Sequence, residues 1–370
     1  MKNVLVGLLV LVFLFTSCVK QNPMDVVIDV CPEDLLSEMV HAGSQKEFDN
    51  VYFETMLLHE LNDGDFIDQF FNRAEIMYPN KKFISYFKSF DGELAPNASN
   101  EEVIEFFQMK KQQAMDAVGV ILEARFDGFN DGVQINRGLD QITIQLYNIE
   151  DEKRVYSFIQ KSGNVEFLEI YRQEEIASFM FETFELSEDL RDDIGEYFQV
   201  YGAGVMFVKE TDLAAANNRL EELDRIENFP EELKFMWSAA PEENYETGEM
   251  GYILYPCRYP NNGIPYVSGR AITSASMGFN SDNNELTVNL TMTAEGSDKW
   301  ARMTENNVGR AIAITMDDQV YSAPNVISAI TGGDTQISGN FTEEEAEDLA
   351  QIIGSGSFPI SCKIRSIKKH

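Results

Sequence analysis

The side chains that most often carry chemistry are few and widely spaced in this 370-residue sequence. None of the histidines or downstream cysteines has the spacing of a metal site. There is also no Gly-rich phosphate loop and no nucleophile elbow. We therefore predict no catalytic residue, no metal ion and no cofactor, and we expect the protein not to be an enzyme. The residues in question are His41, His59, His370, Cys31, Cys257 and Cys362.

The residue whose surroundings do predict a reaction is Cys18. Lys2 precedes an unbroken apolar run, residues 4–15, which is too short to span a membrane as a helix and has the length of a signal-peptide core. Residues 15–18, Phe-Thr-Ser-Cys, resemble the lipobox of bacterial lipoproteins, in which the cysteine thiol is acylated. We expect residues 1–17 to be a lipoprotein signal peptide and residues 18–23 a lipidated tether. An ordinary cleaved signal beside a chance cysteine is the alternative.

An exported location permits disulfides, but three downstream cysteines leave at least one thiol unpaired. Buried free thiols are the preferred interpretation for Cys31, Cys257 and Cys362, with one disulfide among them as the alternative. The residues after Cys18 carry no acidic run, which favours a periplasm-facing anchor in a bacterial envelope membrane. The choice between inner and outer membrane stays open.

The chain is strongly acidic, with a formal net charge of -33 at pH 7. Nucleic-acid phosphates would be repelled by such a surface, so we expect no nucleic acid among the partners. A solvated surface is the simplest interpretation of the charge, and a preference for basic or unfolded partners is the alternative. An apolar content of 44% is ample for packed cores.

Strands are expected where apolar and polar residues alternate, and helices where apolar residues recur at spacings of three and four residues. In the first half, the expected strands are 25–30, 133–136, 142–146 and 165–170. The expected helices are an insert within 32–98, a helix at 99–126 opened by a capping box of Ser99 and Glu102, and a helix at 150–161. This βαββαβ order predicts a ferredoxin-like α+β unit.

In the second half, clear strand and helix patterns begin only after residue 263. Residues 172–263 are interpreted as a connecting segment, helical at 187–201 and 211–223 and irregular at 228–263. The later strands are expected at 270–279, 285–292, 310–316, 320–323, 335–337 and 360–367. The later helices are expected at 294–305, capped by Thr293, and at 342–353, opened by Thr342 with Glu345.

An ordered series of motifs in the last third of the chain resembles SecD, specifically its large extracytoplasmic domain. The motifs are 303–314 (MTENNVGRAIAI), 320–324 (VYSAP), 330–333 (ITGG), 337–342 (ISGNFT), 345–350 (EAEDLA) and 354–359 (GSGSFP). A weaker match covers 115–171, and the helical insert before it is similar to that of fused SecDF proteins. The resemblance therefore extends over most of the chain that follows Cys18.

The resemblance implies a fold and a role. The fold would be α+β, with a ferredoxin-like base at 24–171 plus 341–370, a long helical insert at 32–98, and an inserted α+β head at 264–340. SecD and SecF assist protein export from the outer side of the membrane, and the head is thought to hold the emerging chain. We therefore expect a lipid-anchored accessory that binds unfolded secretory proteins or Sec translocon components. A SecD-like scaffold reused for another envelope interaction is the alternative.

The head motifs supply the candidate site residues. Those expected to contact unfolded polypeptide are Tyr321, Ser322, Pro324, Thr331, Gly332 and Gly333. Those expected to serve the fold are Gly309, Arg310, Gly339, Asn340, Thr342, Gly356 and Pro359. The pair Gly332-Gly333 would permit the positive φ of a tight turn.

The sequence departs from the family in several places. The Gly-Leu-Asp-Leu-x-Gly-Gly segment before the first strand is absent, and residues 20–23 stand there. No membrane helices follow the domain, so we expect no proton-driven motor activity from this chain alone. The usual Asp-Gly of the head hairpin is replaced by Asp317-Asp318, where a positive φ would cost about 1 kcal/mol.

Overall fold

In the computed structural model, the described residues run from 23 to 370 with gaps at 60, 63, 89–92, 128–132, 148, 150, 173, 177–196, 202–204, 224–229, 262 and 282–283. The expected signal peptide and Cys18 lie outside them, as does most of the expected helix at 187–201. The described end of that range is strand β5 (Gln199–Tyr201) rather than helix. Within the described residues, no helix is long and apolar enough to cross a membrane.

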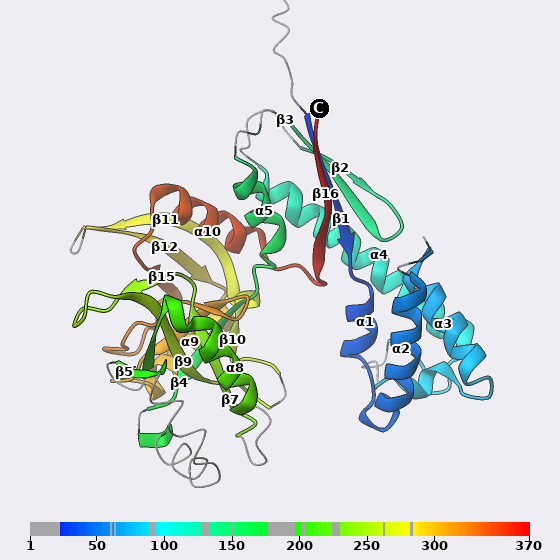
Figure 1. Cartoon of the computed structure of the whole chain (residues 1–370), viewed down its shortest axis with the longest axis horizontal. Coiled ribbons are helices and arrows are strands. Elements are labelled where there is room, and N and C mark those ends of the chain that lie inside the picture. The colour runs from blue at the N-terminus through cyan, green and yellow to red at the C-terminus, as the bar shows by residue number, and fades with distance from the viewer. Residues whose placement is uncertain are drawn as a thin grey trace, which may run out of the picture.

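A four-stranded sheet, here called the base sheet, joins the two ends of the described chain (Figure 1). Its strands are β1 (Pro23–Val30), β2 (Val133–Arg137), β3 (Gln141–Tyr147) and β16 (Cys362–Lys369). The order is β16-β1-β3-β2, and every neighbouring pair is antiparallel. Alternate residues of β1 and β3 are buried, because one face of the sheet packs on α4 (Asn100–Arg125) and α5 (Glu152–Gln160). The Ser99–Glu102 capping box of α4 is present.

The expected last strand of this unit, β4 (Val165–Ile170), lies elsewhere. It pairs antiparallel with β13 (Ile312–Met316) of the head, while β16 takes the place beside β1. The assignment of β4 to the base sheet is therefore corrected. Five of its six residues are buried, and a strand covered on both faces has no alternation that would identify its neighbours.

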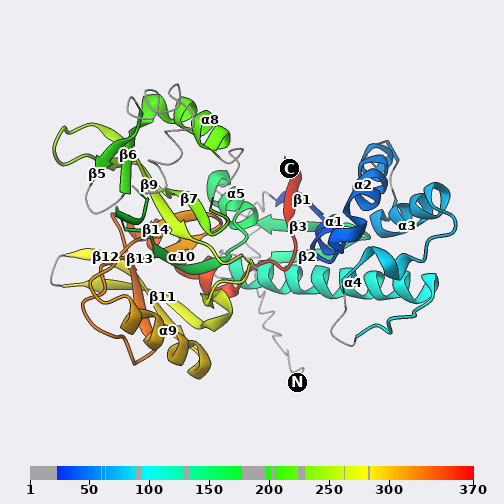
Figure 2. The same cartoon turned by 90° about the horizontal axis from the view of Figure 1, so that it is seen from below.

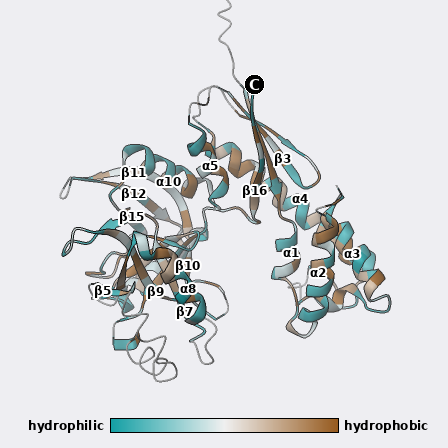
Figure 3. Cartoon of the chain, in the orientation of Figure 1, coloured by the Kyte–Doolittle hydropathy of each residue, from teal (hydrophilic) through white to brown (hydrophobic). Residues whose placement is uncertain are grey.

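The insert between β1 and α4 is helical, as expected, and has a core of its own (Figure 2). It consists of α1 (Glu33–Glu38), α2 (Gln45–His59) and α3 (Phe66–Met77), with 3-10 turns at Ala42–Ser44 and Phe83–Tyr86. These elements pack on the N-terminal half of α4 through aromatic rings, among them Phe48, Phe70, Phe71, Phe87 and Phe107. Hydrophobic and hydrophilic residues alternate along α2 and α3 (Figure 3), which is the pattern of half-buried helices.

The head is built around a small closed barrel. Its strands pair in the order β4, β13, β14 (Gln319–Ser322), β7 (Leu233–Ser238) and β9 (Met250–Arg258), and β9 pairs back to β4. A cluster of buried side chains fills it, including Leu168, Met236, Ile253, Tyr255 and Val320. The same sheet is extended by β5, β6 (Val205–Lys209), β8 (Glu242–Glu243) and β10 (Val267–Ser268).

Residues 172–263 are therefore more than a connection. The helix expected at 211–223 is confirmed as α8 (Leu213–Leu223), but β7 and β9 occupy the part that was interpreted as irregular, and that interpretation was wrong. Two residues of β9 explain why the sequence did not predict this strand. Pro256 cannot donate a ladder hydrogen bond. A Cβ on Gly251 would lie 2.2 Å from the Val208 carbonyl oxygen, so this close strand approach requires glycine.

A second, three-stranded sheet completes the head. It has the order β11 (Ile272–Asn280), β12 (Glu285–Met292), β15 (Asp334–Ser338), and it packs on α9 (Ala294–Asn306) and α10 (Glu343–Ser355). The expected caps Thr293 and Thr342 are both present. Helix α10, assigned from sequence to the base, packs mainly on β11 and β12 and also touches α4. Base and head consequently share one continuous hydrophobic core, which includes Ile144 of the base sheet and Trp300 of the head.

Lys111 of α4 ties the insert to the base sheet. Its ammonium group is buried and bonds to Asp65, which caps α3, and to Asp140 of the β2–β3 turn at 2.8 Å. A second oxygen of Asp140 accepts from the backbone NH of Phe66 at 3.1 Å. Burial alone would raise the pKa of Asp65, but the hydrogen bonds from Lys111, the Asp68 amide and Gln108 lower it. Burial would lower the pKa of Lys111, but its hydrogen bonds to Asp140 and Asp65 raise it, so the Asp65 carboxylate and the ammonium stay charged together.

Replacing Lys111 by alanine should loosen α3. Both carboxylates would remain buried without their cation, which costs about 3 kcal/mol. Hydrogen–deuterium exchange should show roughly a hundredfold faster exchange in Phe66–Met77. The neighbouring Lys110→Ala is the matched control, since Lys110 pairs with Glu93 at the surface and such pairs contribute about 1 kcal/mol or less. Equal effects of the two substitutions would contradict the role of Lys111.

Candidate functional site

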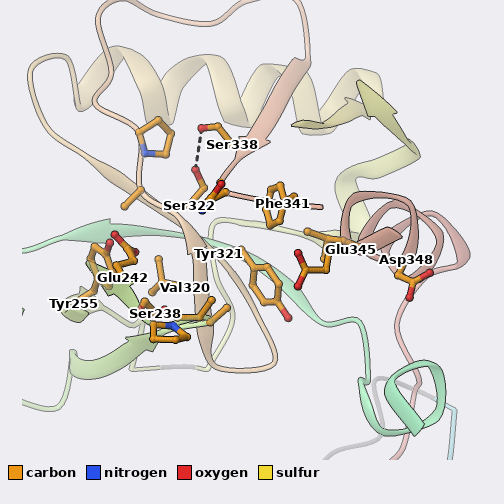
Figure 4. Close-up of a pocket in the computed structure, with 18 of the residues that line it drawn as sticks. Ser238, Glu242, Tyr255, Val320, Tyr321, Ser322, Ser338, Phe341, Glu345 and Asp348 are labelled. Carbon is orange, nitrogen blue, oxygen red and sulfur yellow. Dashed lines mark hydrogen bonds between the residues drawn. The ribbon is translucent and has the colours of Figure 1, made fainter. Parts of the chain in front are cut away.

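A cleft of about 590 Å³, here called the head cleft, opens at the mouth of the barrel (Figure 4). One wall is formed by β14 and the loop that follows it, and another by the chain between β7 and β8 together with β9. The link from β15 to α10, α10 itself and the end of α5 close the remaining side. Residues from five parts of the chain thus meet here: 157–161, 238–242, 255, 320–324 and 338–349.

The structure separates the residues expected to contact polypeptide into two places. Tyr321, Ser322 and Pro324 line the head cleft. The other three do not: the Thr331 carbonyl lies beside α9, 3.4 Å from the Ser297 hydroxyl, and Gly332 and Gly333 follow it. Of the two glycines, Gly333 has the positive φ that was expected, at 72°. A second hollow, of about 840 Å³, lies near β10 and α1 and is lined by none of the six.

The head cleft lies where the pairing between β14 and β7 ends. The parallel ladder between β14 and β7 covers Gln319↔Trp237 and Val320↔Ser238. At its last pair, the hydroxyl of Ser238 donates to the carbonyl of Ala240 at 2.8 Å and accepts from the NH of Ile253 at 3.1 Å. These bonds turn the chain away from β14. The end of β14 therefore borders the cleft, facing the last residue of β15 across a Ser322–Ser338 oxygen contact of 3.5 Å.

One end of the cleft carries Tyr255 and Glu242 (Figure 4). The Tyr255 side chain belongs to the barrel core, and only 9% of the residue is exposed. Burial, reinforced by the Glu242 charge, raises the pKa of Tyr255 well above its usual range. The walls also remove part of the water around Glu242 and raise the pKa of its carboxyl, although the residue as a whole remains exposed.

The other end carries Glu345 and Asp348 of α10. The Glu345 carboxylate accepts from the NH of Thr342 at 2.9 Å, so it is held in the capping box. Burial raises the pKa of Asp348 despite its ion pair with Arg154 at 2.6 Å. The rings of Tyr321 and Phe341 lie between the two ends (Figure 4). The cleft thus combines acidic ends with an aromatic middle.

The residues expected to serve the fold have identifiable structural partners. Arg310 donates to the Ile170 carbonyl at 3.2 Å and pairs with Glu175 at 2.9 Å, which fixes the chain that leaves β4. Gly309 and Gly356 have φ of 80° and 90°, as a left-handed backbone requires. Two others of this set, Gly339 and Asn340, line the head cleft, and Pro359 lines the second hollow.

The reactive side chains form no constellation. Among the described residues, no group of three or more His, Cys, Asp and Glu could hold a metal ion. Cys31, Cys257 and Cys362 are free, and burial raises the pKa of each thiol to about 12. Cys362 is paired with Val30 across β1 and β16, so Cys31, one residue further, points to the opposite face. A disulfide between them is therefore excluded.

Comparison with known proteins finds similarity to one family. Residues 258–360 match the model of the SecDF P1 head subdomain. The chain is 27% identical to protein translocase subunit SecD of Rhodothermus marinus over 92% of its own length and 60% of that protein. It is 28% identical to SecD of Calditerrivibrio nitroreducens over 72% of its own length and 44% of that protein. This chain is similar to SecD over most of its length. It spans about half the length of these curated relatives.

Solved SecDF structures resemble the chain more loosely. The crystal structure of SecDF in its Super-membrane-facing form has a TM-score of 0.44 and 22% identity, over 70% of this chain and 28% of that one. The match to the SecDF head begins at residue 258 and so leaves out β7 and nearly all of β9. Those two strands bring Ser238 and Tyr255 to the head cleft, and β8 brings Glu242; sequence reasoning missed all three. The apolar and aromatic residues of β7, Phe235, Met236 and Trp237, were the available local signal.

A further residue that sequence reasoning missed is Arg125, at the end of α4. It lies where two linkers, 161–164 and 355–359, cross between base and head; together we call them the neck. Its guanidinium is fully buried, and burial lowers its pKa to about 10. It donates to carbonyls of both linkers: Lys161, Ser162 at 2.8 Å and Gly356 at 3.2 Å. It also donates to the Phe158 carbonyl of α5 at 2.7 Å and to the Ser355 hydroxyl at 3.2 Å, and it stacks on the Phe358 ring at 4.0 Å.

Replacing Arg125 by methionine should loosen the neck. Several buried carbonyls would lose their donor, and each such group costs about 1–3 kcal/mol. Amide exchange within the neck should accelerate at least about tenfold, while the β13–β14 hairpin changes less. Arg154→Met is the control, because Arg154 forms partly exposed ion pairs that contribute about 1 kcal/mol or less. An unchanged neck in Arg125→Met would contradict this role.

Proposed function

We propose that this chain is a non-catalytic accessory protein in protein export and that it binds unfolded polypeptide in the head cleft. The observation that carries the proposal is that Tyr321, Ser322 and Pro324, from the motif shared with SecD, line a cleft of about 590 Å³. This volume falls within the range of about 300–1,000 Å³ that is usual for ligand sites. The proposed role is binding, and it includes no proton-driven motor step.

The arrangement of strands favours an extended ligand. The pairing of β14 with β7 ends at Val320, and β15 is the edge of its sheet, so two strand edges border the cleft. Strand edges offer backbone donors and acceptors to an added strand. A folded protein has already satisfied its own backbone groups, whereas an unfolded one has not. The cleft should therefore discriminate by conformation, as an export accessory requires.

The full chain, purified in detergent, should bind a reduced and alkylated secretory protein more tightly than the native disulfide-bonded form. Tyr321→Ala should weaken binding of the unfolded form about fivefold to tenfold, because it removes an aromatic contact worth about 1 kcal/mol or more. Tyr266→Ala, an exposed tyrosine outside the head cleft, is the control. Fluorescence anisotropy measures both. Equal affinity for the folded and unfolded forms would overturn the proposal.

We also propose that the chain is an exported lipoprotein held to the membrane through Cys18 and facing the periplasm. The described chain begins at Pro23, whose carbonyl accepts from the NH of His370 at 3.0 Å. Figure 1 shows this end of the base sheet on the side away from the head and the insert. A tether at Cys18 would thus leave the head cleft open to the aqueous space. We further propose that the base is ferredoxin-like, with β16 as its fourth strand; the antiparallel order β16-β1-β3-β2 supports this.

Substitution of Cys18 by alanine should release the protein into the soluble fraction, because the acyl chains that hold it would not be attached. Membrane fractionation followed by immunoblotting measures this. Cys31→Ala is the matched control and should stay with the membrane, since that buried cysteine lies inside the base. Retention of the Cys18→Ala protein in membranes would refute the lipid anchor.

The second candidate function is a SecD-like scaffold for another envelope interaction. Helix α2 favours it, because Phe53 and Leu57 are 63% and 48% exposed and Leu61, just beyond its end, is 80% exposed. Phe53 and Leu57, spaced four residues apart, share one helix face. Such an exposed apolar stripe is typical of protein–protein contact. If neither the folded nor the unfolded secretory protein binds, this candidate replaces the first.

A further inference from the structure

The Glu242 carboxylate could bind a cation, and no described basic side chain pairs with it. It lines the head cleft, yet it forms no ion pair with any basic side chain that the structure describes. The other cleft carboxylates are engaged: Glu345 in the capping box and Asp348 with Arg154. The basic residue that lines the cleft, Lys161, has its ammonium group over the Tyr321 ring at 5.5 Å. Glu242 is therefore the available negative charge.

A second observation at the same end is independent of charge. Tyr255 is more than nine-tenths buried, and it lines the cleft beside Glu242 (Figure 4). Its hydroxyl has no hydrogen-bond partner among the residues that the structure describes. The residue borders the cleft, so a ligand bound there can supply the hydroxyl with a partner. The phenol oxygen can accept a hydrogen bond from an ammonium or guanidinium group that also reaches Glu242.

The remainder of the cleft limits which cation can reach this end. The aromatic rings of Tyr321 and Phe341 occupy its middle, and the edges of β14 and β15 border it. Together these features suit an extended main chain that carries an apolar side chain in the middle and a long basic side chain at one end. Lysine and arginine have long apolar stems and charged tips, which match an aromatic passage that leads to a carboxylate.

We propose that Glu242 and Tyr255 form a subsite for a lysine or arginine side chain of the bound extended polypeptide. This inference rests on the proposed function of the head cleft and adds a chemical preference to it. Secretory segments with a basic residue next to an apolar one would be held more tightly than neutral or acidic ones. The strongly negative charge of the chain would favour the same ligands at longer range.

The test uses the full chain in detergent and three dye-labelled, unstructured peptides. They share one apolar stretch and carry lysine, glutamine or glutamate beside it. At low salt the lysine peptide should bind about threefold to tenfold more tightly than the glutamine peptide, and the glutamate peptide more weakly still. Added salt should reduce the difference. Glu242→Gln should abolish the preference, and the matched control Glu243→Gln, on the same strand but outside the cleft lining, should keep it.

A further variant separates charge from hydrogen bonding. Tyr255→Phe should lower the affinity for the lysine peptide severalfold and for the glutamine peptide less, because it removes the acceptor and leaves Glu242 in place. Equal binding of all three peptides would overturn the basic subsite and leave the head cleft as a polypeptide site. A lysine preference that survives Glu242→Gln would overturn the assignment to Glu242. Absence of binding by every peptide would overturn the subsite together with the proposed function.

Discussion

The relation between base and head depends on one buried cation, the guanidinium of Arg125. A fully buried charge is tolerated only when its donors are satisfied, and here the acceptors are carbonyls of both neck linkers. Because the acceptors come from both the outgoing and the returning chain, the requirement to satisfy Arg125 fixes where the linkers cross. The head cleft is bounded by α5 on one side of that crossing and by α10 and the barrel on the other, so its walls are set by the same constraint.

Helix α4 carries two buried cations of this kind. Its 26 residues extend over about 39 Å. Arg125 at its C-terminal end binds the neck, and Lys111 in its middle binds the carboxylates that join the insert to the β2–β3 turn. Each cation organises polar groups from separate segments, which apolar packing alone would not orient. The three parts of the molecule are thereby positioned against a single rigid element, while each keeps the apolar contacts that stabilise it.

The sequence predicted what local physics controls and missed what depends on distant pairing. Caps at Ser99, Thr293 and Thr342 and the alternation of β1 and β3 rest on residues a few positions apart, and all are present. The pairing of β4 with the head and the barrel strands β7 and β9 depend on partners far along the chain. Arg125 gave no signal, since a basic residue in the last turn of a helix is usual at the surface. Half of the residues expected to contact polypeptide line the head cleft. Glu242 and Tyr255 also line it, but they lie on strands that the sequence did not predict.

The Asp317-Asp318 turn shows how a local cost is offset by contacts that only the fold supplies. Both residues have positive φ, 52° and 63°, which costs each non-glycine residue about 1 kcal/mol. Glycine would avoid that cost but would offer no carboxylate. Asp317 accepts from the NH groups of Gly163 at 3.2 Å and Asn164 at 3.0 Å and from the Ser162 hydroxyl, all in the neck. Asp318 pairs with Lys234 at 2.6 Å and so joins the turn to β7. Asp317, which an Asp-Gly turn would share, therefore holds the hairpin to the linker that Arg125 binds from the other side. The departure, Asp318 in place of glycine, adds an ion pair between the hairpin and β7 within the barrel.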